Sequence, residues 1–364
     1  MRIAVRADAG LLLGSGHVMR TLALASALRA RGATVTFLSR RRDGDMHERI
    51  VHDGFVVRPL KSETDASDAW LGASIQSEIV ASTRALQVDG GVDALIVDHY
   101  RLDAAWEQAM RPFARCIVVI DDLADRPHDC DLLVDSNLGA DERGRYRELA
   151  PGARLLLGPG YALLREEFRE PIRRARPRDG QIERINVFMG GFDRSDETSK
   201  VLRALGSRPG APFRIDVVLP TWAPFGGAVR ERYVGKPAIH AVHIYDETAE
   251  IAALFEAADL AVGAGGSAIW ERCALGLPSV VISVADNQRA GAGQCEIAGA
   301  ALWLGDAALV GESDIALAVE DLQRDPRAVA EMSRRARIVS GARGGAFSTD
   351  LVASAVLEAI DARL

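Results

Sequence analysis

The sequence lacks the marks of several classes of protein. Its net charge is −7, whereas a general nucleic-acid-binding protein is usually basic. None of its apolar runs approaches the roughly 18 residues that a membrane helix needs. Its first residues, MRIAVRADAG, lack the apolar segment of a signal peptide. We therefore expect a cytoplasmic protein that neither inserts into a membrane nor binds nucleic acid.

The sequence also lacks a recognisable metal site or disulfide framework. Its four cysteines are scattered, without a Cys-x-x-Cys pair, which fits a reducing compartment. Two Asp-x-Asp triplets, at residues 43–45 and 129–131, are more simply explained by chance, since one lies in a charged loop and the other overlaps the start of a predicted strand. His240 and His243 have no cluster of acidic residues beside them. We expect no metal and no cofactor.

Patterns of buried strands alternate with helical patterns in both halves of the chain. With 364 residues, of which 48% are hydrophobic and 26% charged, the chain has enough material for two cores. Short runs rich in Val, Ile and Leu between helical stretches are typical of parallel sheets. Such runs occupy residues 2–8, 33–39, 55–60, 94–100, 116–122 and 131–137 in the first half, and 184–191, 213–220, 241–247, 259–266 and 278–285 in the second.

This alternation predicts an α/β protein with two doubly wound, Rossmann-like domains that face each other across a cleft. We place the first domain at residues 1–170 and the second at residues 171–340. The stretch 165–184, dense in Arg and Glu, is interpreted as a solvated linker or an exposed helix. Residues 341–364 have a helical pattern, and we expect them to pack back on the first domain. In such sheets ligands bind beyond the carboxyl ends of the strands.

A histidine opens the first predicted helix. The segment GSGH follows the first strand, and Gly14 and Gly16 let the backbone approach a ligand closely. The segment is not a GxGxxG fingerprint, and no acidic residue ends the second strand, so we expect no dinucleotide site. The dipole at a helix N-terminus disfavours a protonated imidazole, so His17 is suited to accept a proton, and Arg20, one turn further on, is a candidate substrate-binding residue. A simple capping role for His17 fits its position equally well.

Two glycine-rich turns end strands in the second half. MGGFDRSDET permits a ligand to approach the backbone, although a capped turn of this kind is common. GAGGSAIWER follows another strand, and its amides are suited to a phosphate at the start of a helix. The glutamate one turn further is suited to a ribose diol, or simply to the helix dipole. The candidate residues of these turns are Gly190, Gly191, Gly266, Ser267, Ala268 and Glu271.

Together these stretches resemble a known family. Residues 258–288 resemble the nucleotide-binding half of GT-B sugar-nucleotide enzymes, in particular the UDP-N-acetylglucosamine transferase that makes peptidoglycan lipid precursors. The whole chain is more similar to the UDP-2,4-diacetamido-2,4,6-trideoxy-β-L-altropyranose hydrolases of pseudaminic acid biosynthesis and their spore-coat polysaccharide relatives. The stretches that carry this similarity are RADAG…GSGHVMR (6–20), IVDHYRLD (96–103), IDDLADRPHDCDLLVDSN (120–137), LLLGPGYALLREEF (155–168), FMGGFD (188–193) and GGSAIWERCALGLP…DNQ (265–288).

The resemblance implies a GT-B fold, a UDP-sugar as partner and a set of site residues. It assigns the catalytic histidine to His17 and an active-site tyrosine to Tyr100. It further assigns UDP contacts to Ser267, Ala268 and Glu271, with Glu271 on the ribose, and sugar contacts to Asn287 followed by Gln288. Backbone groups near Ile244 and Tyr245 are expected to bind uracil.

The resemblance also implies a reaction. His17 activates water for attack at C1, and UDP leaves with inversion and without a metal, which gives the free sugar for pseudaminic acid and thus for flagellin glycosylation or a surface polysaccharide. Two alternatives stay open: a GT-B glycosyltransferase that uses a UDP-amino sugar, and a UDP-sugar binder without activity. RRRDGDMHER, residues 40–49, is basic but not apolar, which favours water over a membrane acceptor. The oligomeric state is open, with a monomer favoured.

Overall fold

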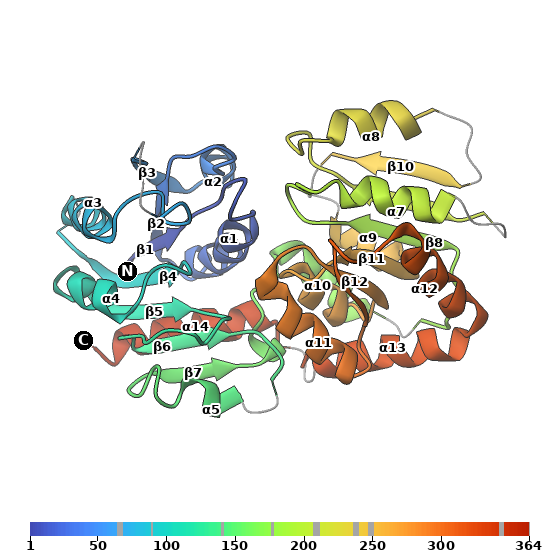
Figure 1. The fold of residues 1–364 in the computed structure, drawn as a ribbon. Coiled ribbons are helices and arrows are strands. Elements are labelled where there is room, and N and C mark those ends of the chain that lie inside the picture. Colours follow the sequence, from blue (N-terminus) through green and yellow to red (C-terminus); the bar gives the residue numbers. More distant parts are fainter. Residues whose placement is uncertain are drawn as a thin grey trace. The chain divides into compact units, whose positions relative to one another are not determined.

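The computed structural model describes residues 1–63, 68–88, 90–139, 142–175, 178–206, 212–235, 240–246, 251–341 and 346–363. The chain forms two compact units (Figure 1). The N-terminal unit consists of Met1–Glu166 and Ala346–Leu364, and the C-terminal unit consists of Glu167–Gly345. The sequence analysis placed the boundary near residue 170 and began the returning segment at residue 341.

The N-terminal unit is built on a parallel sheet of seven strands, paired in the order β3-β2-β1-β4-β5-β6-β7. The chain runs outward from β1 to β3 and then returns to β4 on the other side of β1, so the strand order reverses between β1 and β4. Its strands are β1 (Arg2–Ala7), β2 (Thr34–Arg40), β3 (Val56–Leu60), β4 (Val92–Asp98), β5 (Ala114–Ile120), β6 (Leu132–Asp135) and β7 (Arg154–Leu157).

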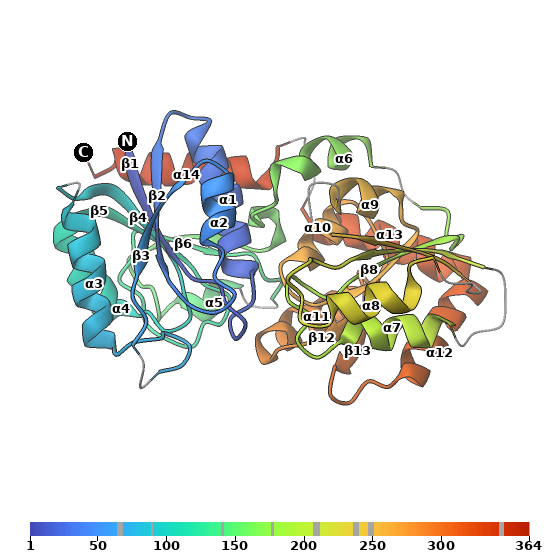
Figure 2. The same ribbon diagram turned by 90° about the horizontal axis from the view of Figure 1, so that it is seen from above.

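Helices cover both faces of this sheet, because its central strands present apolar side chains to both sides. Ile3 and Val5 of β1 pack against one set of helices, which contains α1, α2 and α14, whereas Ala4 and Leu95 face α3 and α4. Figure 2 shows α1 and α3 on opposite sides of the strands. The helices and 3-10 turns are α1 (Gly16–Arg29), α2 (His47–His52), α3 (Ile75–Gln87), α4 (Ala104–Met110), η1 (Arg111–Phe113), α5 (Glu142–Tyr146), η2 (Pro159–Tyr161) and α14 (Ser348–Asp361).

Helix α14 brings the end of the chain onto the N-terminal unit. Val352, Val356 and Ile360 recur at intervals of four residues and are buried in the same core as α1. The helix begins at Ser348, whose hydroxyl donates to the carbonyl of Ala162 at 2.5 Å. The N-terminal unit therefore completes its core with a segment that lies about 180 residues beyond the rest of it.

The C-terminal unit repeats this architecture with a parallel sheet of six strands, in the order β10-β9-β8-β11-β12-β13. Its strand order reverses between β8 and β11. Its strands are β8 (Arg184–Phe188), β9 (Arg214–Val218), β10 (Ala241–Tyr245), β11 (Leu260–Ala264), β12 (Ser279–Ser283) and β13 (Leu302–Asp306).

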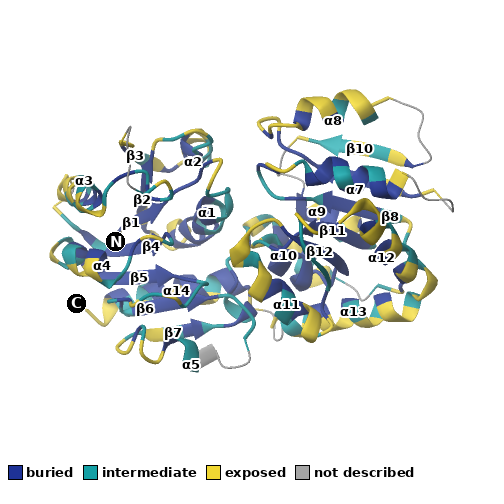
Figure 3. Cartoon of the chain, in the orientation of Figure 1, coloured by how far each residue is buried: buried dark blue, intermediate teal, exposed yellow. Residues whose placement is uncertain are grey.

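Helices α7, α12 and α13 pack against one face of the second sheet, while α9, α10 and α11 contact the strands β8, β11 and β12. The central strands are buried, and exposed residues gather on outer helices such as α8 (Figure 3). The remaining elements are η3 (Glu166–Phe168), α6 (Arg169–Arg174), α7 (Glu197–Gly206), α8 (Gly226–Tyr233), α9 (Ile251–Ala257), α10 (Ala268–Ala274), η4 (Asp286–Gln288), α11 (Arg289–Ile297), α12 (Glu312–Arg324) and α13 (Pro326–Val339).

The structure confirms the two doubly wound sheets that the sequence predicted. Every predicted strand is found within a few residues of its expected place, although residue 247 at the end of one lies outside the described residues. Strands β7 and β13 were not predicted. The charged stretch 165–184 contains the short helix α6, and the cleft between the domains stays a prediction. Among the described residues, no helix is long and apolar enough to cross a membrane.

Candidate functional site

The predicted catalytic residues lie at the carboxyl edge of the first sheet, where its strand order reverses. His17 is the second residue of α1, which follows β1, and Tyr100 follows β4. The connections that leave β1 and β4 go to opposite sides, and this divergence opens a crevice in doubly wound sheets. Gly14, at φ +80°, and Gly16 form the turn into α1, and no heavy atom lies within 4 Å of a Cβ placed on Gly14.

The imidazole of His17 is held by a carboxylate from the neighbouring strand. Its Nδ1 lies 2.6 Å from Oδ1 of Asp98, the last residue of β4, and both side chains are almost fully buried. A carboxylate can only accept, so Nδ1 carries the proton in this bond, and in the tautomer that fits this contact the lone pair is on Nε2. Ser15, not His17, occupies the N-cap position of α1.

Arg20 fixes Asp98 in turn. Its Nε and Nη2 donate to the two oxygens of Asp98, each at 2.6 Å, and its Nη1 donates to Asp122 at 2.7 Å. Burial alone would raise the pKa of Asp98, but the charge of Arg20 and the hydrogen bonds hold that pKa well below its ordinary value. Arg20 was predicted to bind substrate, and the structure gives it two carboxylate partners inside the protein.

Tyr100 packs against His17. The two ring centroids are 4.5 Å apart and the planes meet nearly at right angles, which is a favourable edge-to-face geometry. Burial, followed by the negative charge of Asp122, raises the pKa of Tyr100 well above its ordinary value, so the phenol keeps its proton. The side chain of Tyr100 is therefore a neutral hydrogen-bonding group beside the candidate base.

A second group of carboxylates continues along the same edge, at the ends of β5 and β6. The hydroxyl of Tyr146 lies 2.9 Å from Asp121 and 3.0 Å from Asp135, and Arg145 pairs with Asp135 at 2.9 Å. Burial raises the pKa of Asp135 to about 6, and its hydrogen bonds only partly oppose this. This group contacts the His17 network through Asp122, whose carbonyl accepts from Arg145 at 3.2 Å.

The C-terminal unit places its predicted residues at the corresponding edge of the second sheet. Gly190 and Gly191 follow β8, and the turn needs a glycine because Gly190 has φ +94°. The indole nitrogen of Trp222 donates to the carbonyl of Gly191 at 3.0 Å, and 44% of the Trp222 surface is exposed. The turn thus lies beside an open aromatic ring that the sequence analysis did not consider. Asp193 caps the following helix, α7, through the amides of Glu197 and Thr198.

The second glycine turn follows β11 and is joined to the loop after β12. The side-chain carbonyl of Gln288 accepts from the amide of Gly265 at 3.2 Å and from that of Val284 at 3.0 Å. A Cβ on Gly265 would lie 3.3 Å from Gln288, so the two loops are in close contact. Gln288 was predicted to bind substrate, and in the structure its oxygen holds these two loops together. The other predicted residues here are Gly266, half-buried, Ser267, exposed, Ala268, half-buried, and Asn287, exposed.

Helix α10 carries two buried charged residues behind this turn. Glu271, the predicted ribose contact, is 7% exposed. Arg272 is 1% exposed, and its Nη2 donates to the carbonyl of Ala264 at 2.8 Å. Burial lowers the pKa of Arg272 to about 10, so it still carries its charge at neutral pH. Gly263 leaves the space for this guanidinium, because a Cβ there would lie 2.7 Å from Arg272.

The residues predicted to bind uracil lie on β10, at the edge of the second sheet. Ile244 is half-buried against the core, and the backbone carbonyl of Tyr245 accepts from the amide of Leu219 at 2.9 Å. The Tyr245 hydroxyl accepts from Arg214 at 3.0 Å. The Tyr245 side chain and its carbonyl thus have partners within the unit.

Two other features lie away from these edges. A cavity in the C-terminal unit is bordered by Arg178 and by Asp259, which precedes β11, so it lies at the opposite, amino-terminal edge of the sheet. Arg178 is committed there to main-chain carbonyls of Ala258, Leu275 and Gly276. Within the described ranges, no group of three or more His, Cys, Asp or Glu side chains is arranged to hold a metal ion.

The sequence analysis missed the partners that orient its predicted residues. Asp98 and Asp122 lie in the last residues of predicted strands, in IVDHY and VVIDD, and carboxylates at strand ends are the signal that could have found them. Arg272 and Trp222 had no comparable signal, since an arginine within a helix and a tryptophan in a loop are ordinary.

Comparisons with known proteins agree with this architecture. Residues 227–346 match the model of the glycosyltransferase family 28 C-terminal domain. The crystal structure of MurG from Acinetobacter baumannii superposes with a TM-score of 0.65 and 14% identity, and the match covers 98% of this chain and 99% of that one. The fold is therefore GT-B.

Three curated proteins are similar in sequence. The spore coat polysaccharide biosynthesis protein SpsG of Bacillus subtilis is 26% identical over 312 residues, 85% of each chain. The UDP-2,4-diacetamido-2,4,6-trideoxy-β-L-altropyranose hydrolase of Campylobacter jejuni is 24% identical over 194 residues, 53% of this chain and 61% of that protein. An uncharacterized protein of Methanocaldococcus jannaschii is 25% identical over 293 residues, and the match spans only 57% of its length. The chain is thus a distant homologue of these proteins with a GT-B fold.

Proposed function

We propose that this protein is an enzyme that cleaves a UDP-sugar at its anomeric carbon with water as the acceptor, and that UDP-2,4-diacetamido-2,4,6-trideoxy-β-L-altropyranose is its substrate. The observation that carries the proposal is the 2.6 Å contact of His17 Nδ1 with Asp98. It leaves Nε2 as the proton acceptor of a neutral imidazole, which is what a general base for water requires. The sugar identity is supported by the similarity to the Campylobacter jejuni hydrolase.

In this proposal each reacting group has a place. Nε2 of His17 takes a proton from water, the water oxygen bonds to C1 from the face opposite the leaving group, and the bond from C1 to the diphosphate oxygen breaks. The negative Asp98 stabilises the imidazolium that forms, and Arg20 keeps Asp98 in position. UDP leaves as an anion and the free sugar has an inverted anomeric centre.

The C-terminal unit is proposed to bind the UDP. The turns at Gly190–Gly191 and Gly265–Ser267 bring main-chain amides to the carboxyl edge of the sheet, where doubly wound folds bind ligands. The charged, buried Arg272 lies directly behind the second turn, with its guanidinium bonded to the carbonyl of Ala264. A fixed positive charge there favours a diphosphate at the turn.

A glycosyltransferase is the second candidate, since a hydroxyl acceptor would use the same base. The family 28 domain match supports it. So do Leu11 and Leu12, which are 37% and 43% exposed in the loop between β1 and α1, because an apolar acceptor could contact them. The basic segment at residues 40–49 does not support a membrane acceptor, as its scarcity of apolar residues already indicated. Arg40 is buried, and Arg42 is mostly buried and bonded to carbonyls.

The test is release of UDP without an acceptor. The purified protein is incubated with the UDP-diacetamido sugar alone, and UDP and free sugar are followed by NMR. Stoichiometric release at a steady rate, with the first product of inverted configuration, supports the hydrolase. Tight binding with release only after an acceptor alcohol is added identifies the transferase. His17→Ala is the matched variant: it should lose about 10²–10⁴-fold in kcat and keep its Kd for UDP.

A further inference from the structure

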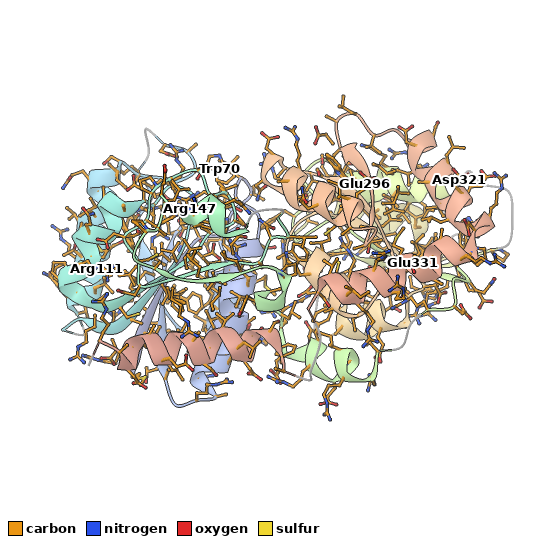
Figure 4. All side chains as sticks on the ribbon, turned by 90° about the horizontal axis from the view of Figure 1, so that it is seen from below. Trp70, Arg111, Arg147, Glu296, Asp321 and Glu331 are labelled. Carbon is orange, nitrogen blue, oxygen red and sulfur yellow. The ribbon has the colours of Figure 1, made fainter. Side chains whose placement is uncertain are left out.

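Trp70 is the third ring in a series that begins with the candidate base, His17, and continues through Tyr100. Its ring centroid is 6.0 Å from that of Tyr100, which is 4.5 Å from that of His17. Trp70 lies in the segment between β3 and α3 and is half-buried, so part of its indole meets solvent. Figure 4 shows it on the side of the N-terminal unit away from α14. No sequence pattern had pointed to it.

The backbone around Trp70 is fixed from two sides. The guanidinium of Arg42 donates to the carbonyls of Trp70 at 3.1 Å and of Leu71 at 2.9 Å. The carboxylate of Asp68 accepts from the amides of the same two residues, at 2.9 Å and 3.0 Å. Gly72, at φ +71°, leaves room for this arrangement, because a Cβ there would lie 2.7 Å from Arg42.

Arg42 and Asp68 each contact a residue near the candidate site. Arg42 lies 3.5 Å from Asp8, which follows β1 and is fully buried. Burial would raise the pKa of Asp8, but its pairing with Arg6 holds that pKa well below its ordinary value. Asp8 therefore keeps its negative charge opposite Arg42. On the other side, Asp68 pairs with Arg101, the neighbour of Tyr100. The segment that carries Trp70 is therefore tied to the ends of β1 and β4.

Leu71 already provides the core contact of this segment. It is 2% exposed and packs in the cluster beneath α3 and α4, whereas the adjacent Trp70 keeps part of its ring outside that cluster. Arg42 and Asp68 thus hold the backbone of a half-buried tryptophan at a fixed place. They prepare a flat apolar surface for a ligand before it binds.

We infer that Trp70 contacts the sugar of the UDP-sugar, with its ring packed against the apolar C–H and methyl groups of a hexose while Tyr100 and His17 face the reacting end. This inference rests on the proposed function and adds a residue that determines sugar specificity. A tryptophan face has no groups that would recognise a diphosphate, so its contribution should be confined to the sugar and should be absent with UDP alone.

The test uses the whole chain labelled with 5-fluorotryptophan, in the His17→Ala background so that bound substrate is preserved. The chain has five tryptophans, and Trp70→Phe identifies the resonance of Trp70 in the ¹⁹F NMR spectrum. We expect this resonance to move on titration with the UDP-diacetamido sugar and to stay in place with UDP. If calorimetry shows that the UDP-sugar binds but the Trp70 resonance does not move, Trp70 does not contact the sugar, and the proposed function is unaffected. If neither UDP nor the UDP-sugar binds, both proposals fall.

Kinetics give an independent measure. Trp70→Ala should raise KM for the UDP-sugar about tenfold, because a lost ring contact is worth roughly that factor, and should leave product inhibition by UDP unchanged. Trp70→Phe should restore most of the loss. Val80→Ala, on the exposed side of α3, is the control and should behave as the unmodified protein. An equal rise of KM and of the UDP inhibition constant in Trp70→Ala would contradict a sugar-specific contact.

Discussion

The two units use one architecture and fill the edge of the sheet differently. In the N-terminal unit the edge where the strand order reverses is occupied by side chains: His17, Asp98, Arg20 and Asp122 form a connected set of hydrogen bonds. In the C-terminal unit the corresponding edge is formed by glycine turns, and the charged residues Glu271 and Arg272 are buried behind one of them. Side chains are suited to proton transfer and main-chain amides to anion binding, and this difference is why the proposed function places the chemistry in the first unit and the nucleotide in the second.

The largest effect should come from Asp98→Asn. The amide that replaces the carboxylate can donate to Nδ1, which would move the imidazole proton to Nε2 and remove the base. We expect kcat to fall by about 10²–10⁴-fold, with the Kd for UDP unchanged. The measurement is steady-state kinetics beside calorimetry of UDP binding.

Asp122→Asn is the matched variant for this test. It removes the negative charge opposite Arg20 Nη1 but keeps an acceptor oxygen there, and it leaves the contact between His17 and Asp98 intact, so its kcat should fall by less than about tenfold. If the two variants lose the same activity, the assignment of proton transfer to the His17–Asp98 pair is wrong. A large loss of UDP affinity in Asp98→Asn would also break the division of labour between the units.

A smaller effect should come from Asp135→Asn, and it should depend on pH. The pKa of Asp135 is raised from its ordinary 3.8 to about 6 in the folded protein. The folded state therefore binds this proton more tightly than the unfolded state, and its stabilising contribution is lost as pH rises from 4 to 7. The loss is about 2 kcal/mol of unfolding free energy over that range.

The variant cannot ionise at this position, so its stability relative to the unmodified protein should increase by about 2 kcal/mol between pH 4 and pH 7. Urea unfolding at both pH values measures this difference. A constant offset between the two proteins at all pH values would show that Asp135 ionises normally. Either result sharpens the comparison, because burial also raises the pKa of a carboxyl group at the corresponding edge of the second sheet, that of Asp193.

The smallest effect concerns the C-terminal unit. Gln288→Ala removes the oxygen that accepts from Gly265 and Val284, and should lower the free energy of unfolding by about 1–2 kcal/mol and weaken UDP binding. Gln288→Glu keeps that acceptor, so stability should recover, while its negative charge beside the proposed diphosphate site should keep UDP binding weak. Recovery of both properties in Gln288→Glu would mean that no anion binds at this turn. Thermal unfolding measures the stability of each variant, and calorimetry measures its affinity for UDP.

The sequence predicted the strands of the two sheets better than it predicted the contacts among the residues of the candidate site. Runs such as ALIVDHY and VVISVA identify central strands because such strands must be apolar on both faces. Strand β7 has only four residues, RLLL, and β13 contains Gly305 at φ +111° together with an irregular register, so neither has a clear strand pattern. Position alone placed His17 and the glycine turns at strand ends.

The pairing of these residues could not be predicted in the same way. His17 and Asp98 are 81 residues apart, and they meet because β4 pairs with β1 instead of following β3 at the edge. The position of Trp70 depends on hydrogen bonds from its backbone to Arg42 and Asp68. In the sequence, these two charged residues look like ordinary surface residues. Such contacts follow from strand order, which residue patterns along the chain do not specify.

Helix α14 has a consequence for how the protein is made. Its apolar side chains close the core around α1, yet the ribosome adds them only after all of Glu167–Gly345 has been synthesised. The N-terminal unit therefore lacks part of its core until synthesis ends, whereas the C-terminal unit is synthesised as one continuous stretch. The N-terminal unit can complete its core only after the last helix of the chain has been made.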